Sequence, residues 1–310
     1  MIVAYFGNDE WEPFAPGLKK IDDATDIRRR ILLAFEEAEV TEDPAERARL
    51  LTFAIIGGGP TGVEMAGAIA ELARKALARD FRNINPGEAH VMLVQSGPRL
   101  LPVFHEKLSR VAERTLTKLG VEVRTGNRVT ECDGKSICFG DQRMPVGTVI
   151  WAAGVAGSQA AKWLGGEKDR AGRVVIGPDL SFPGHPEIMV VGDTAATTDV
   201  TGQTVPGVAP AAKQAGRYAA RAILARLGGK TEIAPFRYRH AGNMATVGRH
   251  GAVTELGWIK LWGRPAWFLW GAAHIWFLIG FRNRMVVLMD WMWNYLTFRR
   301  GARLITGTQY

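Results

Sequence analysis

The chain has 310 residues, a length that favours two domains over one. Its apolar content of 47% and charged content of 23% are those of an ordinary globular protein, which excludes a disordered or fibrous chain. The net charge of +8 is unevenly spread, but its basic residues form no recognisable nucleic-acid-binding module, so no nucleic-acid partner is expected.

The first ten residues lack both a basic n-region and a long apolar run, so we expect no signal peptide. Residues 5–17 are aromatic and are expected to be irregular. A helix is predicted from about Asp22 to Glu39, and Asp43-Pro44 predicts a turn.

From Phe53 onward, apolar runs alternate with helical patterns, as in an α/β domain with a buried parallel sheet. The expected elements are a strand ending at Ile56, a helix from Pro60 to about Arg79, a strand over Val91–Val94, a helix from about Glu106 to Leu119, and strands over Val121–Arg124 and Thr148–Trp151. Further strands are expected over Arg173–Ile176 and Ile188–Val191, and a helix over Ala209–Leu227.

The two cysteines, Cys132 and Cys138, match no zinc-binding spacing and form no Cys-x-x-Cys motif. They flank a hairpin expected at Asp133-Gly134. We therefore interpret them as two reduced thiols and predict no metal site.

A glycine-rich turn connects the first predicted strand to its helix. Gly57, Gly59 and Gly62 form Gly-x-Gly-x-x-Gly, and Pro60 and Thr61 lie between the last two. In such motifs the first glycine makes the tight turn, the second lets the backbone approach a pyrophosphate, and the third permits close packing of helix on strand. The N-terminus of the helix adds free N–H groups and positive potential. The position of the motif inside a βαβ unit predicts dinucleotide binding; a turn that only packs is the alternative.

The residue that ends the second strand bears on which dinucleotide is bound. A carboxylate there would bind the ribose 2′-hydroxyl of NAD, but this chain has Gln95. An amide can still bond a ribose hydroxyl and would not repel a 2′-phosphate. With Ser96 and Arg99 nearby as donors, we expect NADPH to be tolerated better than it would be with an acid at this position.

Several segments together resemble one family, the type II NADH dehydrogenases, which are FAD-dependent and act at a membrane surface. They are residues 5–12, the stretch from Gly57 to Gly67 with Glu64, residues 151–155 (Trp-Ala-Ala-Gly-Val), residues 190–193 (Val-Val-Gly-Asp) and residues 209–216. They occur in the family's order, from about residue 5 to the end of the chain.

The resemblance implies a role for each matching residue. The three glycines would hold the pyrophosphate of NADH, Glu64 would lie near nicotinamide, flavin and quinone, and Gly154 would line the nicotinamide. Asp193 would bind the ribityl chain of FAD. Simpler roles remain open, because an acid is favoured anyway in the first turn of a helix and as an N-cap.

The quinone-site motif of the family, Ala-Gln-x-Ala-x-Gln, corresponds to residues 209–214. Pro210 replaces its first glutamine, which leaves that glutamine's role in doubt here. The match implies that Ala212 lies close to the flavin and Gln214 close to the quinone. Lys213 is interpreted as a solvated lysine.

The C-terminal section is aromatic and basic. Seven of the ten tryptophans lie between Trp258 and Trp293, and from Trp258 onward Asp290 is the one acid against seven Lys or Arg, three of them Arg299, Arg300 and Arg303. The uncharged run from Ala266 to Phe281 is shorter than the roughly 20 residues of a membrane span. We therefore predict peripheral, monotopic attachment to an anionic membrane surface at the cytoplasmic face of the inner (plasma) membrane. A buried helical hairpin or a homodimer interface is the alternative.

We predict an α/β fold with a Rossmann-like three-layer dinucleotide-binding domain at residues 49–155. Residues 1–48 and 156–235 would be parts of an FAD domain, and residues 236–310 a helical, membrane-associating region. Members of the family have two glycine fingerprints, and this sequence contains only the second, so the segment that holds the ADP half of FAD is expected to be missing.

Two functions follow. The first is NADH:quinone oxidoreduction, in which hydride passes from NAD(P)H to FAD and then to a membrane quinone, without proton pumping. The alternative is an NAD(P)H-binding, membrane-associated fragment without bound flavin or independent catalysis. The chain has no redox-active Cys-x-x-Cys pair, which argues against a flavin disulfide reductase and a sulfide:quinone oxidoreductase.

Overall fold

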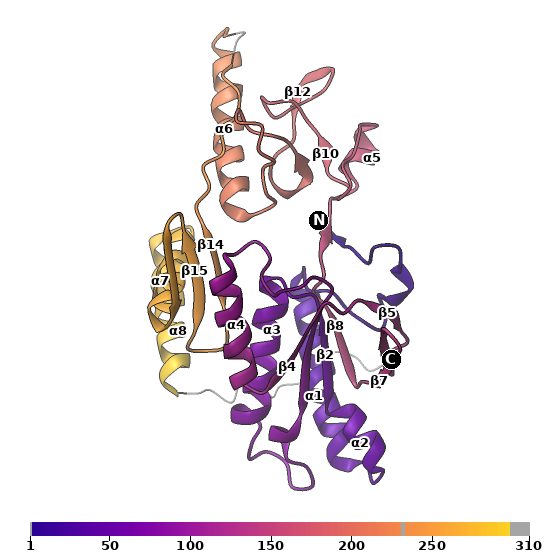
Figure 1. Cartoon of the computed structure of the whole chain (residues 1–310). Coiled ribbons are helices and arrows are strands. Elements are labelled where there is room, and N and C mark those ends of the chain that lie inside the picture. Colours follow the sequence, from indigo (N-terminus) through magenta and orange to yellow (C-terminus); the bar gives the residue numbers. More distant parts are fainter. Residues whose placement is uncertain (1, 231–232, 298–310) are drawn as a thin grey trace. The chain divides into compact units, whose positions relative to one another are not determined.

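The structure is a computed structural model that describes residues 2–230 and 233–297 (Figure 1). Its chain divides into two compact units. One contains Tyr5–Gly154 together with the chain from Gly242 onward, and the other contains Val155–Ala241 with the N-terminal strand β1 (Ile2–Val3). Arg299, Arg300 and Arg303, which contribute to the predicted attachment to an anionic membrane surface, lie outside the described residues.

The larger unit is built on a four-stranded parallel sheet of order β4-β3-β2-β8. Its strands are β2 (Thr52–Ile56), β3 (His90–Gln95), β4 (Val121–Thr125) and β8 (Thr148–Trp151). β2 and β8 are buried along their whole length and β3 over its four central residues. These apolar runs were predicted as buried strands, and they confirm the Rossmann-like α/β fold.

Helices cover one face of this sheet. They are α1 (Ile21–Val40), α3 (Pro60–Glu71) and α4 (Glu106–Lys118). Phe35 of α1 packs against Phe53 of β2 with ring centroids 5.2 Å apart, and both side chains are fully buried. Phe53 and Ile55 share this core with Val63 of α3. On the opposite face Trp151 of β8 packs against the N-terminal aromatic segment, which has a 3-10 turn, η1, at Asp9–Trp11.

A small antiparallel sheet of order β5-β6-β7 lies between β4 and β8 in the chain's path. Its strands are β5 (Val129–Cys132), β6 (Ser136–Phe139) and β7 (Gln142–Pro145). The guanidinium carbon of Arg124 in β4 lies 4.8 Å from the ring centroid of Phe139 in β6, which ties this sheet to the parallel one. The hairpin predicted at Asp133-Gly134 is confirmed.

The C-terminal part of the larger unit packs on α3. A hairpin of β14 (Asn243–Thr246) and β15 (Ala252–Leu256) is extended by β16 (Ile259–Gly263), and α7 (Arg264–Phe277) and α8 (Phe281–Thr297) follow. Figure 1 shows these elements, in orange and yellow, beside α3 and α4. Gly67 permits the approach of α3 to the hairpin, because a Cβ there would lie 2.8 Å from the backbone nitrogen of Gly248.

The smaller unit contains one long helix and several short strands. The helix, α6 (Ala209–Leu227), has the predicted bounds. The other elements are β9 (Val155–Ala156), α5 (Ala160–Leu164), β10 (Val174–Val175), β11 (Ser181–Phe182), β12 (His185–Met189), η4 (Gly192–Thr194) and β13 (Ala195–Ala196). Buried residues of α6, including Ala211 and Ala215, share a core with Val174 and Phe236.

The structure corrects several predicted bounds. Asp43-Pro44 was predicted as a turn, but it begins a helix, α2 (Pro44–Leu50). The Asp43 carboxylate accepts a hydrogen bond from the Ala45 N–H, and proline fits the first helical position because its missing N–H would have no partner there. The α-helix from Pro60 ends at Glu71 and continues as a π-helical turn, η2 (Leu72–Ala76), while Pro86–Glu88 form a 3-10 turn, η3. The strand predicted over Ile188–Val191 is displaced to β12.

Candidate functional site: a dinucleotide cavity and an apolar cavity

The glycine-rich turn has the geometry that its sequence predicts. Gly57 has φ +114°, and a Cβ there would lie 2.4 Å from the carbonyl oxygen of Ala152. A Cβ on Gly62 would lie 1.8 Å from the carbonyl oxygen of Gly57, so this glycine lets α3 pack against the turn. Gly59 differs from both, since a Cβ there would meet nothing within 4 Å. Packing therefore requires glycine at positions 57 and 62, whereas Gly59 faces open space.

That open space is a cavity of about 540 Å³ at the carboxyl ends of β2, β3 and β8. Its lining includes Gly57, Gly59, Pro60, Thr61, Gln95 and Gly154 among the predicted residues. Gly62 is not among the residues that line it. The first turn of α3 opens onto the cavity, so its N–H groups and positive potential are directed at whatever binds there. An elongated anion such as a pyrophosphate fits this arrangement.

Gln95 is held by the glycine turn. Its side-chain oxygen accepts a hydrogen bond from the Gly58 N–H at 2.8 Å, which leaves the amide NH₂ as a donor. Arg99 was expected to be a nearby donor, but its guanidinium donates to the carbonyl oxygens of Pro102 and Phe104 and to the hydroxyl of Ser109. Arg99 therefore stabilises the loop after β3 instead. Ser96 and Arg128 line the cavity.

Other cavity residues were not singled out as site residues from the sequence. They are Tyr5, Phe6, Asn8, Trp11, Pro102, Asn127 and Arg128. The Tyr5 hydroxyl donates to the Ala15 carbonyl, and burial, followed by the nearby Glu12 carboxylate, raises the pKa of Tyr5 to about 12. Tyr5 therefore stays protonated and positions the wall of the cavity. The aromatic N-terminal segment entered the sequence analysis only through the family resemblance, and its chemistry gave no signal that it would line this cavity.

Glu64 lies apart from these residues, on the side of α3 that faces the C-terminal hairpin. One oxygen of its carboxylate accepts hydrogen bonds from the backbone N–H and the hydroxyl of Thr246, at 3.0 and 3.2 Å. It lines a second cavity, of about 790 Å³, whose walls are largely apolar side chains of α7 and α8. They are Trp267, Phe268, Trp270, Ile275, Leu288, Trp291 and Met292.

The remaining predicted residues belong to the smaller unit. Asp193 follows Gly192, which has φ +75° and whose built Cβ would lie 3.4 Å from the Cβ of Ala212. Asp193 and Ala212 are thus neighbours. Gln214 lies two residues further along α6, but both polar atoms of its side chain bond the backbone of Arg239 at 2.9 Å. The Gln214 amide therefore fixes the backbone at Arg239, three residues after the core residue Phe236.

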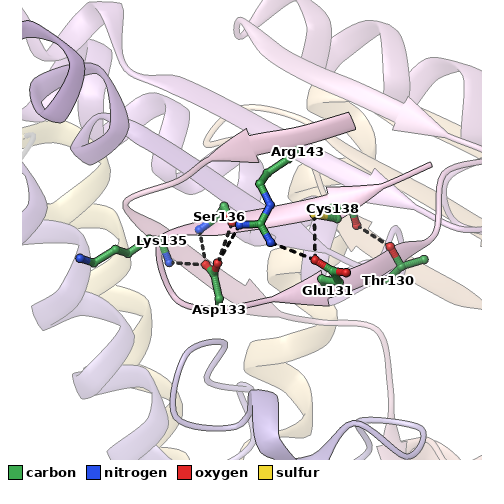
Figure 2. A network of polar contacts seen from close by, with 7 residues as sticks. All are labelled: Thr130, Glu131, Asp133, Lys135, Ser136, Cys138 and Arg143. Carbon is green, nitrogen blue, oxygen red and sulfur yellow. Dashed lines mark hydrogen bonds and ion pairs between the residues drawn. The ribbon is translucent and has the colours of Figure 1, made fainter. Parts of the chain in front are cut away.

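The two cysteines do not line the dinucleotide cavity. Cys132 is buried, and this burial raises the pKa of its thiol. The thiol of Cys138 lies 3.3 Å from a carboxylate oxygen of Glu131 within an exposed polar network, in which Arg143 bridges Glu131 and Asp133 (Figure 2). Both cysteines therefore have structural surroundings on the β5–β7 sheet.

Comparison with known protein families gives two matches in succession along the chain. Residues 12–216 match the family described as pyridine nucleotide-disulphide oxidoreductase, and residues 240–300 match the NDH2 C-terminal domain.

Characterised relatives and a solved structure agree with these matches. The type II NADH:quinone oxidoreductase Ndh of Mycobacterium tuberculosis is 45% identical over 317 aligned positions, which cover 99% of this chain and 67% of the relative. NdhA of the same organism is also 45% identical, over 98% of this chain and 66% of the relative. The structure of NDH2 from Plasmodium falciparum in complex with NADH superposes with a TM-score of 0.85 at 18% identity, over 99% of this chain and 77% of that chain. The chain thus spans about two thirds of the length of its mycobacterial relatives.

Proposed function

Because this chain belongs to the family of type II NADH:quinone oxidoreductases, we propose that it transfers electrons from NADH, through FAD, to a membrane quinone. The observation that supports this most directly is the pair of cavities along α3. One, at the start of the helix, is shaped for a dinucleotide, and the other, one turn further, is apolar and lined by the C-terminal helices.

The first cavity fits the nicotinamide dinucleotide. Gly59 leaves the pyrophosphate free access to the backbone, and the N-terminus of α3 stabilises its charge. Pro60 and Thr61 lie at the same helix end, and Gly154 forms the wall beside the exposed ring of Phe6. We assign the ribose contact to Gln95, whose NH₂ remains available as a donor. An uncharged side chain at this position is compatible with both NADH and NADPH, because it does not repel a 2′-phosphate.

Asp193 and Ala212 fit part of an FAD site. A half-buried carboxylate directly after a positive-φ glycine can accept hydrogen bonds from the hydroxyls of a ribityl chain, and the small side chain of Ala212 leaves room for a ring. Bound FAD would supply the two-electron chemistry that links the nicotinamide to the quinone. The residues of this chain bind and orient the reactants.

Glu64 is the residue that we assign to proton handling at the quinone. Its carboxylate lies at the polar end of the apolar cavity and is held there by Thr246. Quinone reduction consumes protons, so a carboxylate positioned at the end of an apolar cavity can pass one on. For Gln214 we propose a positioning role near the quinone, exerted through the backbone of Arg239.

The membrane surface is the place where such a quinone resides. Among the described residues, no helix combines the length and the apolar character needed to cross a bilayer. α7 and α8 expose large apolar side chains, including Phe268, Trp276 and Phe281. We propose that they lie in the interface at the cytoplasmic face of the inner (plasma) membrane, as a monotopic attachment. A homodimer through the same helices is the competing arrangement, and size-exclusion chromatography with light scattering would reveal it.

The experiment that tests the oxidoreductase function uses the purified chain with FAD and membranes supplied. We expect a flavin absorbance band that NADH bleaches and that a short-chain quinone restores. The Glu64→Gln variant should bleach at the same rate and recover more slowly, because only the quinone step uses the carboxylate. A protein that binds NADH but gains no flavin band would contradict the proposal and support the alternative of a binding module.

A further inference from the structure

A third cavity, of about 320 Å³, lies at the tip of the β14–β15 hairpin. Four basic side chains line it, and they come from three separate segments: Lys75 from η2, Arg249 and His250 from the hairpin tip, and Arg264 from the start of α7. All four belong to the larger unit. Residues 75 and 264 are far apart in the sequence, so the fold itself brings these charges together.

The electrostatics of this cavity favour an anion. Glu71 is the one acidic side chain in its lining, and its two carboxylate oxygens accept from the Lys75 ammonium at 2.9 Å and from the Arg249 backbone N–H at 2.7 Å. Burial lowers the pKa of His250. The nearby positive charges of Lys75, Arg249 and Arg264 lower it further, and Glu71 opposes them. Among the lining side chains, Lys75, Arg249 and Arg264 carry three positive charges and Glu71 carries one negative charge, around a space large enough for a phosphate group.

The surroundings of this cavity indicate which kind of anion it takes. It shares Glu71, Gly248 and Arg249 with the apolar cavity under α7 and α8, so the two are adjacent. Arg264 begins α7, a helix that exposes the apolar side chains of Phe268, Trp276 and Phe277. A ligand that places a phosphate among the cations can therefore lay hydrocarbon along the exposed side of α7.

We propose that the cavity formed by Lys75, Arg249, His250 and Arg264 binds the phosphate of an anionic phospholipid, with the acyl chains lying on the exposed apolar face of α7. This site would fix the depth and rotation of the protein on the bilayer, and so bring the apolar cavity toward the membrane in which quinone dissolves. The proposal rests on the proposed function for the membrane contact itself, and adds to it a specific lipid site.

The experiment compares two double variants by flotation with vesicles of phosphatidylcholine, with and without phosphatidylglycerol. Lys75→Gln with Arg264→Gln removes two charges from the cavity, and the new glutamine can still donate to Glu71. Lys162→Gln with Arg170→Gln removes the same two kinds of charge from exposed residues of the smaller unit that do not line the cavity. Thermal unfolding verifies that both variants fold.

We expect phosphatidylglycerol to strengthen vesicle binding by the unaltered protein. In the cavity variant, this increase in binding should be at least about tenfold smaller. The surface variant should keep the gain to within about threefold. Equal losses in the two variants would show that only diffuse charge attraction operates, and would overturn the proposal.

Soluble competitors identify the source of the phosphate. Short-chain phosphatidylglycerol should displace the protein from vesicles, whereas inorganic phosphate at the same concentration should not. Equal displacement by inorganic phosphate would make this a free-phosphate site and contradict the lipid assignment. Neither NADH nor quinone is present in these assays, so the result is independent of catalysis. A protein that binds neither kind of vesicle would instead refute the membrane attachment in the proposed function.

Discussion

Gly59 and Gly62 lie in the same turn but do different work. A side chain at Gly62 would overlap the carbonyl oxygen of Gly57, whereas one at Gly59 would enter the cavity that we propose for the dinucleotide. Glycine at position 62 thus serves packing, and we assign ligand access to glycine at position 59.

A pair of alanine variants separates these roles. We expect Gly62→Ala to lower the free energy of unfolding by about 1–3 kcal/mol, because the backbone must move to relieve the overlap. Gly59→Ala should unfold within about 0.5 kcal/mol of the parent protein but bind NADH at least about tenfold more weakly. Chemical denaturation and NADH titration measure the two quantities. A weakened fold in Gly59→Ala, with NADH affinity intact, would reverse the assignment.

Gln95 is the residue to which we assign the ribose contact, and it presents an uncharged side chain to the cavity. Its oxygen is bonded to Gly58, and a glutamate could keep that bond. We expect Gln95→Glu to lower kcat/KM for NADPH at least about tenfold, since the new carboxylate would repel a 2′-phosphate. The value for NADH should change by less than about threefold. Steady-state kinetics with both cofactors, compared with the unaltered protein, give the ratio. An unchanged ratio would exclude Gln95 from the ribose contact.

At the scale of elements, α3 connects the two cavities. Its N-terminus faces the cavity at the carboxyl ends of β2, β3 and β8, and Glu64, one turn further, faces the apolar cavity. Gly67 then allows the β14–β15 hairpin to approach. In the proposed function, the helix therefore positions the groups for dinucleotide binding, proton handling and membrane contact in sequence along its length.

The contact between α3 and the hairpin predicts that a side chain at Gly67 destabilises the fold, whereas one at a helix glycine without such a contact does not. Gly67→Ala would place a Cβ 2.8 Å from the Gly248 backbone nitrogen, and we expect a loss of about 1–3 kcal/mol in the free energy of unfolding. Gly216→Ala in α6 meets nothing within 4 Å and should be neutral or stabilising by up to about 1 kcal/mol. Denaturant titrations of both variants test the comparison. Equal changes in the free energy of unfolding would mean that the close approach at Gly67 does not require glycine.

At the scale of the whole molecule, the proposed membrane attachment depends on the large apolar side chains that α7 and α8 expose. α7 is anchored from within by Ala266, which is fully buried, and Trp270 stacks on Trp291 of α8 with centroids 5.4 Å apart. Deleting everything from Trp258 would also remove β16, which pairs with β15. Substitutions on the exposed face are therefore the cleaner test.

Three serine substitutions at Trp276, Ile279 and Phe281 should reduce vesicle partitioning at least about 100-fold, because each site loses the transfer free energy of a large apolar side chain. The matched control changes Ile21, Trp163 and Leu227, which are similarly exposed elsewhere, to serine. Co-sedimentation with vesicles measures both proteins. Equal loss, or no loss, would refute the assignment of the membrane face to α7 and α8.

The sequence by itself determined the parallel strands, the long helices and the dinucleotide turn. These features are encoded locally, in apolar runs, capping residues and the steric demands of glycine, so they survive without knowledge of distant contacts. Residues such as Gly57, Gly62 and Gln95 could be placed for this reason. The short helix at Pro44 was within reach of the same rules, since Asp43-Pro44 is also a helix-start signal.

Only the tertiary structure decided which distant residues share a cavity. It engaged Arg99 with its own loop, placed Tyr5 and Phe6 beside the dinucleotide turn, and gave Gln214 the backbone of Arg239 as its partner. It also assembled Lys75, Arg249 and Arg264 around one space. Such groupings depend on how helices and hairpins pack through long-range contacts, and no local pattern of residues records them.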